Sequence, residues 1–269
     1  MTILAAGGSR GFFAQVWYQL VEYGGWFLKG AGYTMMIAII GTIVGTGIGL
    51  MIGTVRTLPT GPHDGTRFRR VVLRVINALL AVYIEVFRGT PMLVQALVVF
   101  FGLKAVIDLD LAPLPTGLLV VSINTGAYMS EIVRGGIQAI DGGQMEAGRA
   151  VGMKHWSIMR GVILPQTIRN IMPATGNEFV INIKDTSVLF LIGVTELFTQ
   201  GKAVLGITYR SFEVYLTIAA IYLVLTYTTT RVLRVLERRL EGPENFTLAT
   251  SQTMPESILL RRHGDGGAR

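Results

Sequence analysis

The sequence alternates between long apolar stretches and short polar connections. Five apolar stretches can be followed, at about residues 27–54, 71–103, 115–140, 169–198 and 215–236. About 20 apolar helical residues are needed to cross a hydrocarbon core roughly 30 Å thick. Each stretch is long enough to do so. The pattern therefore predicts an all-α membrane fold with about five transmembrane helices.

The second stretch is too long for one straight span. Its 33 residues would form a helix of about 50 Å at ~1.5 Å per residue, and Gly89, Thr90 and Pro91 lie in its middle. Thr is a good helix N-cap, and Pro is favoured at the first helical position. We therefore expect a tilted helix that breaks here and a second helix that begins at Thr90.

The two ends of the chain differ from its centre, which places the transmembrane domain at residues 27–240. Residues 1–26 lack the charged start, continuous apolar run and cleavage site of a signal peptide, and we expect an extracytoplasmic or interfacial segment. Its aromatic side chains suit a membrane interface; they are Trp17, Tyr18, Tyr23 and Trp26. Residues 241–269 turn polar and contain Pro and Gly, which predicts a flexible cytoplasmic tail.

Composition supports a membrane protein and argues against other classes. Hydrophobic residues make up 51% of the chain and charged residues only 15%, a balance that soluble domains rarely show. The chain has no cysteine, which excludes disulfides and thiolate metal sites. The net charge of +7 raises the question of nucleic-acid binding. Because the basic residues gather at helix ends on one side, membrane topology explains them better and no nucleic-acid partner is expected.

The distribution of Lys and Arg also predicts the orientation of the chain. The connection after the first stretch is rich in arginine, whereas the connection after the second has only Lys104 beside Asp108 and Asp110. Alternating from a cytoplasmic first connection places the loop at 141–168 on the cytoplasmic side as well. The fifth stretch then ends inside. We expect the N-terminus outside and the C-terminus in the cytoplasm.

The polar loop at residues 144–166 has the pattern of two short helices. Residues 144–151 are good helix formers, and Gly152 can end this helix by adopting a backbone conformation that other residues avoid. Residues 155–162 can form the second helix, and Pro165 marks the entry to the next long one. Such an element can dock into a groove of a soluble partner or lie on the membrane surface. The residues alone leave both readings open.

The same loop carries a spaced motif. Glu146-Ala147-Gly148 is followed after three residues by Gly152, and after nine more by the sequence VILP at 162–165. This spacing resembles the EAA loop, the cytoplasmic helix-turn-helix by which bacterial ABC importer permeases dock onto their ATPase subunit. Gly148 stands where a second Ala is usual, and the Val of VILP where Ile is usual. We expect Gly148 to loosen the first short helix by up to about 1 kcal/mol relative to Ala.

Further stretches resemble ABC permeases for polar amino acids in particular. They read YIEVFRGTP at 83–91, NTGAY at 124–128 with EIVRGG at 131–136, and GNEF at 176–179 with KDTS at 184–187. With the loop, the resemblance covers roughly residues 27–240. It implies a type I-like permease subunit of the bacterial cytoplasmic (inner) membrane. Such subunits pair as homodimers or heterodimers and are fed by an extracytoplasmic solute-binding protein.

The resemblance also implies which residues couple the chain to ATP hydrolysis. Force from the closing ATPase would enter through the loop, at Glu146, Ala147, Gly148, Gly152, Leu164 and Pro165. The chain has no Gly-x4-Gly-Lys-Ser/Thr phosphate loop, so ATP and Mg²⁺ are expected in a separate ATPase subunit. No catalytic residue, metal or bound cofactor is expected in this chain itself.

Candidate substrate-binding residues come from polar positions within the spans. An ionisable group there costs about 2.5 kcal/mol or more and usually faces a partner or a water-filled cavity. Arg88, Gly89 and Thr90 adjoin the expected helix start, whose free N–H groups and positive dipole end suit a substrate carboxylate. Asn124 and Tyr128, four residues apart, add hydrogen-bonding groups on another wall. The alternative for the break is a kink that only packs the bundle.

The fourth stretch supplies groups of the opposite charge. Glu178 and Asp185 are seven residues apart and share one helix face, where they can receive an ammonium group or a cationic side chain. The alternative is a salt-bridge network at a subunit interface. Two further pairs at i,i+3 are open to a purely structural role; they are Glu85 with Arg88 and Glu131 with Arg134.

These observations favour the pathway-forming subunit of an ATP-driven importer for a cationic or zwitterionic polar amino acid, with membrane lipid around it. The main alternative is an ion-coupled secondary transporter, which is expected to show an internally repeated topology that the five spans do not display. An intramembrane metalloenzyme is disfavoured because His63, His155 and His263 fall in loops or the tail. The sequence leaves open which amino acid is carried and whether the permease pairs with itself.

Overall fold

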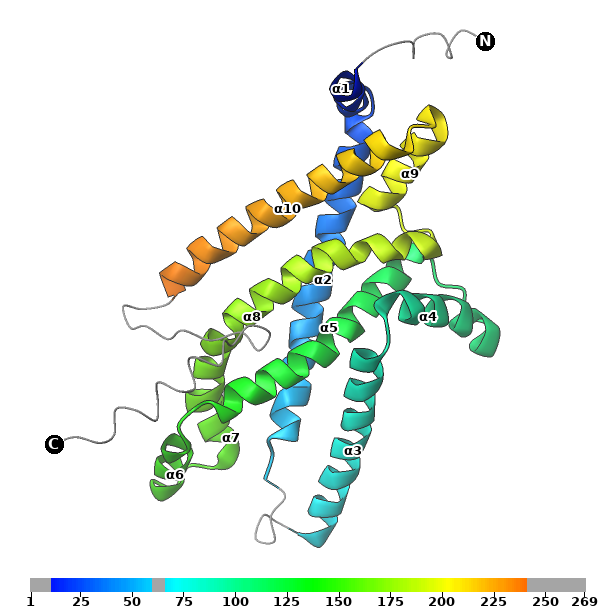
Figure 1. Ribbon diagram of the computed structural model, residues 1–269. Helices are drawn as coiled ribbons and strands as arrows, with labels where there is room; N and C mark the ends of the chain where they lie inside the picture. Colours follow the sequence, from blue (N-terminus) through cyan, green and yellow to red (C-terminus); the bar gives the residue numbers. More distant parts are fainter. Residues whose placement is uncertain (1–10, 60–65, 241–269) are drawn as a thin grey trace, which may run out of the picture.

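The computed structural model describes residues 11–59 and 66–240. Within these ranges the regular structure is helical throughout, as predicted (Figure 1). The predicted tail at 241–269 and the first ten residues lie outside the described ranges. In chain order the elements are α1 (Phe12–Glu22), α2 (Gly24–Arg56), α3 (Arg67–Gly89), α4 (Met92–Ile107), α5 (Pro113–Gln138), α6 (Gly142–Ala150), α7 (His155–Ile158), the π-helical turn η2 (Met159–Ile163), α8 (Leu164–Asp185), the 3₁₀ segment η3 (Thr186–Ile192), α9 (Leu197–Thr208) and α10 (Ser211–Leu240).

Two helices, α2 and α10, are each long and apolar enough to cross a membrane. Two bent pairs meet the same criterion when each is taken as one span. In the first, α3 and α4 meet at 113°, and in the second the helical run from α7 to η3 meets α9 at 54°. Length and composition therefore give two spans, or up to four, in the described part of the chain. The third predicted span corresponds to α5, which this criterion leaves out.

α5 is the polar centre of the bundle. Twelve of its 26 residues are buried, and five of these carry hydroxyl or amide side chains: Thr116, Ser122, Asn124, Thr125 and Ser130. It contacts α2, α3, α4 and α8. A helix enclosed by other helices does not need an apolar surface for lipid. A criterion based on mean hydropathy therefore misses α5, although it lies among the other helices of the bundle.

α2 and α5 pack along a seam of small residues. Glycines recur at every fourth position of α2, and each faces a residue that recurs at every fourth position of α5. The pairs are Gly41 with Val121, Gly45 with Thr125, Gly49 with Met129 and Gly53 with Val133. A Cβ at any of these glycines would collide with its partner. Since both series increase along the chain, the two helices run in the same direction, and close packing explains these four glycines of the first span.

The ends of α2 and α5 are joined by charged side chains. Arg56 forms an ion pair with Glu131, which also binds Arg134 at 2.6 Å and so confirms the second of the two predicted i,i+3 pairs. α6 and α7 follow directly after α5 at this end of the bundle (Figure 1). The arginine-rich connection after α2 and the loop at 141–168 therefore lie on the same side, as the charge pattern predicts.

The fourth predicted stretch ends earlier than expected. α8 stops at Asp185, η3 continues to Ile192, and Gly193 turns the chain with φ of 83° before α9, which was not predicted. The carboxylate of Glu196 caps α9 by accepting hydrogen bonds from the backbone N–H groups of Phe198 at 2.8 Å and Thr199 at 2.7 Å. Glu is an uncommon N-cap, which is why the sequence pattern concealed this helix start.

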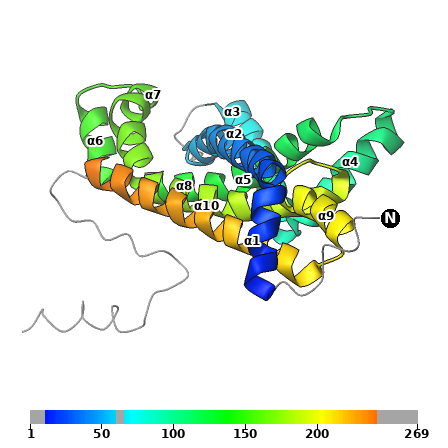
Figure 2. The ribbon, with the colours of Figure 1, turned by 90° about the horizontal axis from the view of Figure 1, so that it is seen from above.

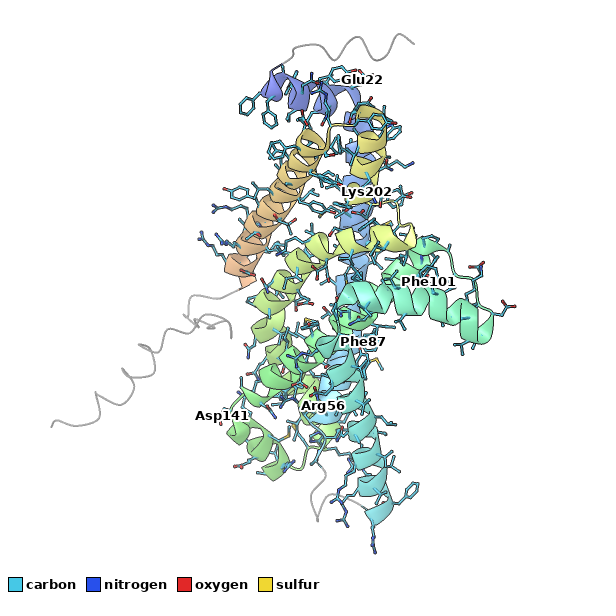
Figure 3. All side chains as sticks on the ribbon, turned by 45° about the vertical axis from the view of Figure 1, so that its right-hand side comes forward. Glu22, Arg56, Phe87, Phe101, Asp141 and Lys202 are labelled. Atoms are coloured by element: carbon cyan, nitrogen blue, oxygen red, sulfur yellow. The ribbon has the colours of Figure 1, made fainter. Side chains whose placement is uncertain are left out.

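α1 lies across one end of the bundle, where it contacts α2 and α10 (Figures 2 and 3). The rings of Phe12 and Phe212 stand 5.4 Å apart between α1 and α10. Trp17 and Tyr18 are exposed on α1, and Tyr23 packs edge-on against Trp26 at the start of α2. The aromatic residues thus gather at one end of the bundle, as an interfacial segment requires.

Candidate transport and coupling sites

A sharp corner joins α3 to α4. α3 ends at Gly89 and α4 begins at Met92, with Thr90 and Pro91 in extended conformation between them. The predicted N-cap at Thr90 is wrong: its Oγ1 donates to the Val86 carbonyl oxygen at 2.8 Å, and Pro91 occupies the N-cap position of α4. Proline disfavours helical geometry in the residue before it, which explains why α3 stops here.

Gln95, a buried residue of α4, holds this corner. Its Nε2 donates to the carbonyl oxygens of Phe87 and Thr90, both at 2.9 Å, and lies 3.0 Å from Thr90 Oγ1. Its Oε1 accepts from Asn124 Nδ2 at 3.0 Å, and the same Asn124 nitrogen donates to the Phe87 carbonyl at 3.2 Å. Sequence reasoning missed Gln95. The available signal was a single amide in the apolar run at 92–103.

Arg88 and Gly89 lie on the open side of the corner. The guanidinium of Arg88 stands over the ring of Tyr128, 5.5 Å from its centroid. The i,i+3 spacing would allow Arg88 to pair with Glu85, but among the described residues neither side chain forms an ion pair. A cation over an aromatic face is attracted by the ring quadrupole. Nothing lies within 4 Å of where a Gly89 Cβ would stand. The corner therefore presents a cation and an accessible backbone together.

We expect Gln95→Glu to disrupt the corner. The carboxylate keeps the size of the side chain and can accept from Asn124, but it cannot donate to the two carbonyls of the corner. Leaving buried acceptors unpaired costs about 1–3 kcal/mol, which should lower the melting temperature of the purified protein by roughly 5 °C. Gln138→Glu, at an exposed site bonded to Arg134, should change it little. Equal melting temperatures would show that Gln95 does not hold the corner.

The predicted acidic face of α8 points toward the middle of the bundle. Glu178 is 6% exposed, and within the described ranges no side chain forms an ion pair or hydrogen bond with it. Asp185 is half-buried at the end of the helix. Between them, Asn182 Nδ2 donates to Thr42 Oγ1 at 2.9 Å and to Thr125 Oγ1 at 3.0 Å. This face of α8 is therefore turned toward α2 and α5.

The seven predicted substrate residues fall into two groups. Arg88, Gly89 and Thr90 meet Asn124 and Tyr128 at the corner. The two carboxylates of α8 form the second group. Among the described residues no hydrogen bond or ion pair joins the groups directly. The link between them is the contact of Thr125, next to Asn124, with Asn182 on α8.

The loop at 144–166 folds into the two predicted short helices. Asp141 caps α6 by accepting from the Gly143 N–H at 2.9 Å. Gly152 ends it with φ of 83° and donates to the Arg149 carbonyl, while the Met153 N–H reaches the Gly148 carbonyl at 3.0 Å. This is the double hydrogen bond of a Schellman C-terminus, which needs a left-handed residue. Gly152 thus has the role that the sequence predicts.

The unusual Gly148 has a packing reason. It is buried against Ile158, and a Cβ at this position would stand 2.7 Å from Ile158 Cγ1 and 2.8 Å from Cδ1. A larger residue on α7 therefore fills the space that an alanine would take. Gly148 and Ile158 behave as a complementary pair, so the loss of helix propensity is accompanied by a gain in contact between α6 and α7.

We expect Gly148→Ala to lower the stability of the loop in the wild-type background, and to lower it much less in an Ile158→Ala background. The second substitution removes the side-chain atoms that the new methyl group meets, so the two effects should be non-additive by about 0.5–3 kcal/mol. Thermal unfolding of the four variants of the cycle measures this coupling. Additive effects would show that the contact does not decide the cost of alanine.

The predicted coupling residues fall into two groups, one at the base of the loop and one on the exposed surface of α6. At the base, Gln144 and Gln166 exchange amide hydrogen bonds of 3.2 and 2.6 Å, and Leu164 packs inward on the buried cluster around Ile158. Pro165 sits in the first turn of α8. Glu146 and Ala147 are exposed on α6. Glu146 and Ala147 are therefore accessible to a partner. Leu164 instead packs inside the loop, against the buried cluster.

The tip of the loop presents apolar residues that sequence reasoning missed. Val151, Met153 and Trp156 are 77%, 38% and 58% exposed. They surround the turn at Gly152, and the basic residues Arg149 and Lys154 stand among them. Large exposed apolar side chains rimmed by charge are typical of a surface that contacts a protein or a membrane. Their signal in the sequence was an apolar group in an otherwise polar loop.

Comparisons with known proteins identify the family of the chain. The model of the family "Binding-protein-dependent transport system inner membrane component" matches residues 65–242. The chain belongs to this family. The glutamine transport system permease protein GlnP of Escherichia coli K12 is 37% identical over 215 residues, covering 80% of this chain and 92% of GlnP.

Two further comparisons agree on the kind of permease. The arginine transport system permease protein ArtQ of Bacillus subtilis is 30% identical over 80% of this chain and 92% of ArtQ. A crystal structure described as an amino acid ABC transporter with histidines is 36% identical, with a TM-score of 0.71, over 86% of this chain and 99% of that chain. The protein is thus a helical, membrane-embedded permease of amino-acid ABC transporters and is not itself catalytic. The family implies an ATPase partner and a binding protein.

Proposed function

We propose that this permease forms the pathway of an ATP-driven importer for a cationic or zwitterionic polar amino acid. The observation that carries the proposal is the single helical run from α7 through η2 to α8. It joins the exposed loop tip to a helix that holds Glu178, a nearly buried carboxylate without a described protein partner. One element thus connects a docking surface with a cation-binding group.

The corner of α3 and α4 supplies the opposite charge. Arg88 can bind the carboxylate of an amino acid, and Gly89 leaves room for close approach to the backbone. The acidic face of α8 can bind the ammonium group or a cationic side chain. The relatives are named for glutamine and arginine, which are zwitterionic and cationic amino acids respectively. Both names are compatible with a site of two charged walls.

We further propose the partners and the orientation of the permease. A separate ATPase subunit, which binds ATP and Mg²⁺, docks on Glu146, Ala147 and the tip around Gly152. A second permease subunit, the same or different, completes the pathway, and an extracytoplasmic solute-binding protein delivers the amino acid. The loop then faces the cytoplasm, and the N-terminus lies outside. Arginines of the connection after α2 lie on the loop side, which supports this orientation.

Reconstitution tests the function directly. The full chain, its ATPase and its binding protein are placed in proteoliposomes, and uptake of labelled glutamine, arginine and glutamate is measured with and without ATP. Uptake of a zwitterionic or cationic amino acid that requires ATP is the expected result. Uptake driven by an ion gradient without ATP would identify an ion-coupled secondary transporter instead. A preference for glutamate would overturn the assignment of charges.

A further inference from the structure

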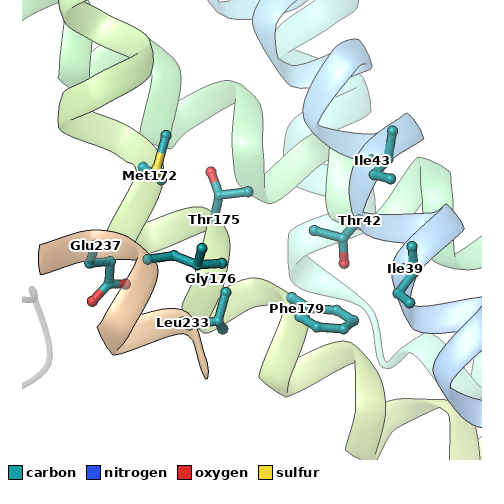
Figure 4. A pocket seen from close by; sticks show the side chains of 10 residues that line it. Ile39, Thr42, Ile43, Met172, Thr175, Gly176, Phe179, Leu233 and Glu237 are labelled. Atoms are coloured by element: carbon teal, nitrogen blue, oxygen red, sulfur yellow. The ribbon is translucent and has the colours of Figure 1, made fainter. Parts of the chain in front are cut away.

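An open groove between α2, α8 and α10 offers few polar groups to a solute (Figure 4). The Thr42 hydroxyl accepts a hydrogen bond from Asn182, and the Thr175 hydroxyl donates to a backbone carbonyl oxygen at 3.0 Å. Apart from Glu237 on α10, the rest of the wall is apolar, and Glu178 is not part of it. A polar route through the permease therefore needs another helix face.

α3 carries a polar stripe along one face. Its positions follow one another at intervals of three or four residues, and at 100° per residue they fall within an arc of about 80°. Between residues 71 and 89 the only other polar side chain is that of Tyr83, whose hydroxyl donates to the Ile123 carbonyl oxygen at 2.6 Å. All positions of the stripe are exposed or partly exposed. The α3 stripe consists of Arg67, Arg70, Arg74, Asn77, Ala81, Glu85 and Arg88, of which Ala81 alone is not polar.

The other two faces of α3 have different surroundings. Leu73 and Ile84 are buried where α3 packs in the bundle, chiefly against α5. A third face is apolar and exposed, with Val75, Leu79 and Val82 exposed by 54%, 66% and 61%. This face suits lipid. Ionisable groups within a span are costly in lipid and usually face a partner or a water-filled cavity, so the stripe is turned away from the hydrocarbon.

Within the described ranges the stripe has few protein partners. Neither Glu85 nor Arg88 forms an ion pair, and two buried atoms, Asn77 Oδ1 and Arg70 Nε, have no hydrogen-bond partner. Buried polar atoms of this kind are normally satisfied by water. A second copy of the chain would not supply the partner by packing stripe on stripe. Each stripe carries four arginines and one glutamate, and like charges brought together across an interface repel.

The stripe leads from the proposed substrate site to the side of the coupling loop. One end is Arg88, which stands over Tyr128 of α5 at the corner. The other end is Arg67, which follows the connection after α2 and so lies on the loop side (Figure 1). The helix between them is about 32 Å long at 1.5 Å per residue, which matches a hydrocarbon core of about 30 Å. The stripe thus extends across the depth of the membrane.

We infer that the α3 stripe forms one wall of a water-filled pathway between the corner and the loop side. The inference rests on the proposed function, because it takes the corner as part of the substrate site. Glu85 can bind the ammonium group of an amino acid whose carboxylate is held by Arg88, since the two side chains lie about one turn apart on the same face. Asn77 and Arg74 then offer a hydrogen bond and a positive charge to the departing carboxylate.

Cysteine labelling tests the inference. The sequence has no cysteine, so a single introduced cysteine reports without background. Cysteines are introduced on the stripe by Ala81→Cys and Glu85→Cys, and on the apolar face by Val82→Cys and Val86→Cys, where the native side chains are 61% and 50% exposed. The full chain with its ATPase, in lipid nanodiscs during ATP turnover, is treated with the water-soluble reagent sulfonatoethyl methanethiosulfonate. Both membrane faces of a nanodisc are open to this reagent.

The cysteines on the stripe should react at least about ten-fold faster than those on the apolar face. Only a thiolate reacts, and each unit by which an apolar environment raises the pKa of a thiol lowers its thiolate fraction about ten-fold. In proteoliposomes that also contain the binding protein, treatment of Ala81→Cys should abolish ATP-dependent uptake, because the attached group blocks the pathway. Treatment of Val82→Cys should leave uptake unchanged.

Two results would overturn the inference and leave the proposed function standing. One is equally slow labelling of the two faces while uptake continues, which would show that protein or lipid covers the stripe. The other is rapid labelling of Ala81→Cys without any effect on uptake, which would place the stripe on water outside the pathway. Absence of uptake in the untreated wild type would instead contradict the proposed function.

Discussion

Gly152→Ala should reduce ATP-dependent uptake about five- to thirty-fold. At φ of 83° an added Cβ meets no other side chain, so the cost is purely one of backbone conformation. A residue other than glycine in the left-handed region costs about 1–2 kcal/mol, which corresponds to that factor in the equilibrium ratio of the correctly folded loop to its other conformations. Gly152→Val should have a larger effect. Uptake in proteoliposomes and co-purification of the ATPase measure the loss.

The loop contains its own control for this substitution. Gly161, in the π-helical turn, is also exposed and has open space around a Cβ, but its φ is not positive. Gly161→Ala should leave uptake unchanged or raise it slightly, because alanine favours helix more than glycine does. If both alanine variants have the same uptake, the Schellman turn at residue 152 is not needed for coupling.

Glu178→Gln and Asp185→Asn should each lower uptake by about 10- to 100-fold while the complex still assembles. A hydrogen bond to a charged group contributes about 1.5–3 kcal/mol, and the amide variants keep the shape of each side chain but lose the charge that a cationic group would meet. The concentration dependence of uptake should shift toward weaker binding. Glu178 should show the larger effect because it is the more buried of the two.

A carboxylate outside the proposed site serves as a control, because its loss should not affect substrate binding. Glu213 pairs with Arg210 at the start of α10, and Glu213→Gln should change uptake little, because ion pairs of this kind contribute at most about 1 kcal/mol. Asp185→Ala with unchanged uptake and normal subunit assembly would rule out a substrate role for that residue. Loss of assembly in both acidic variants would favour the alternative of a salt-bridge network between subunits.

Local sequence patterns were sufficient to predict the two long apolar helices and the loop. α2 and α10 lie where apolar length predicts them, and Gly152 ends α6 because only one residue type suits that turn. The break near Pro91 was also predictable, since proline acts on its immediate neighbour in the chain. In each of these cases the cause of the structure is local.

The remaining features depend on contacts between distant segments. Gln95 holds the corner through Asn124, which is 29 residues away, and no local pattern announces that pairing. Arg88 contacts the ring of Tyr128 and not Glu85, because α5 places an aromatic face next to the corner. Gly148 lowers the helix propensity of α6, and its presence is explained only by its contact with Ile158 on α7. Tertiary partners decide the role of all three residues.

The glycine seam has a mechanical consequence. Every fourth residue of α2 accommodates a side chain of α5 so closely that even one methyl group has no space, and Arg56 fastens the end of the pair to Glu131. We expect two helices packed in this way to move as one rigid unit. If the proposed import requires the bundle to change shape, we expect the change at the breaks between helices, which are the corner of α3 with α4 and the turn at Gly193 after α8. Arg88 lies at the first of these breaks and Asp185 ends the helix before the second, so both proposed charged groups would be repositioned by such a movement.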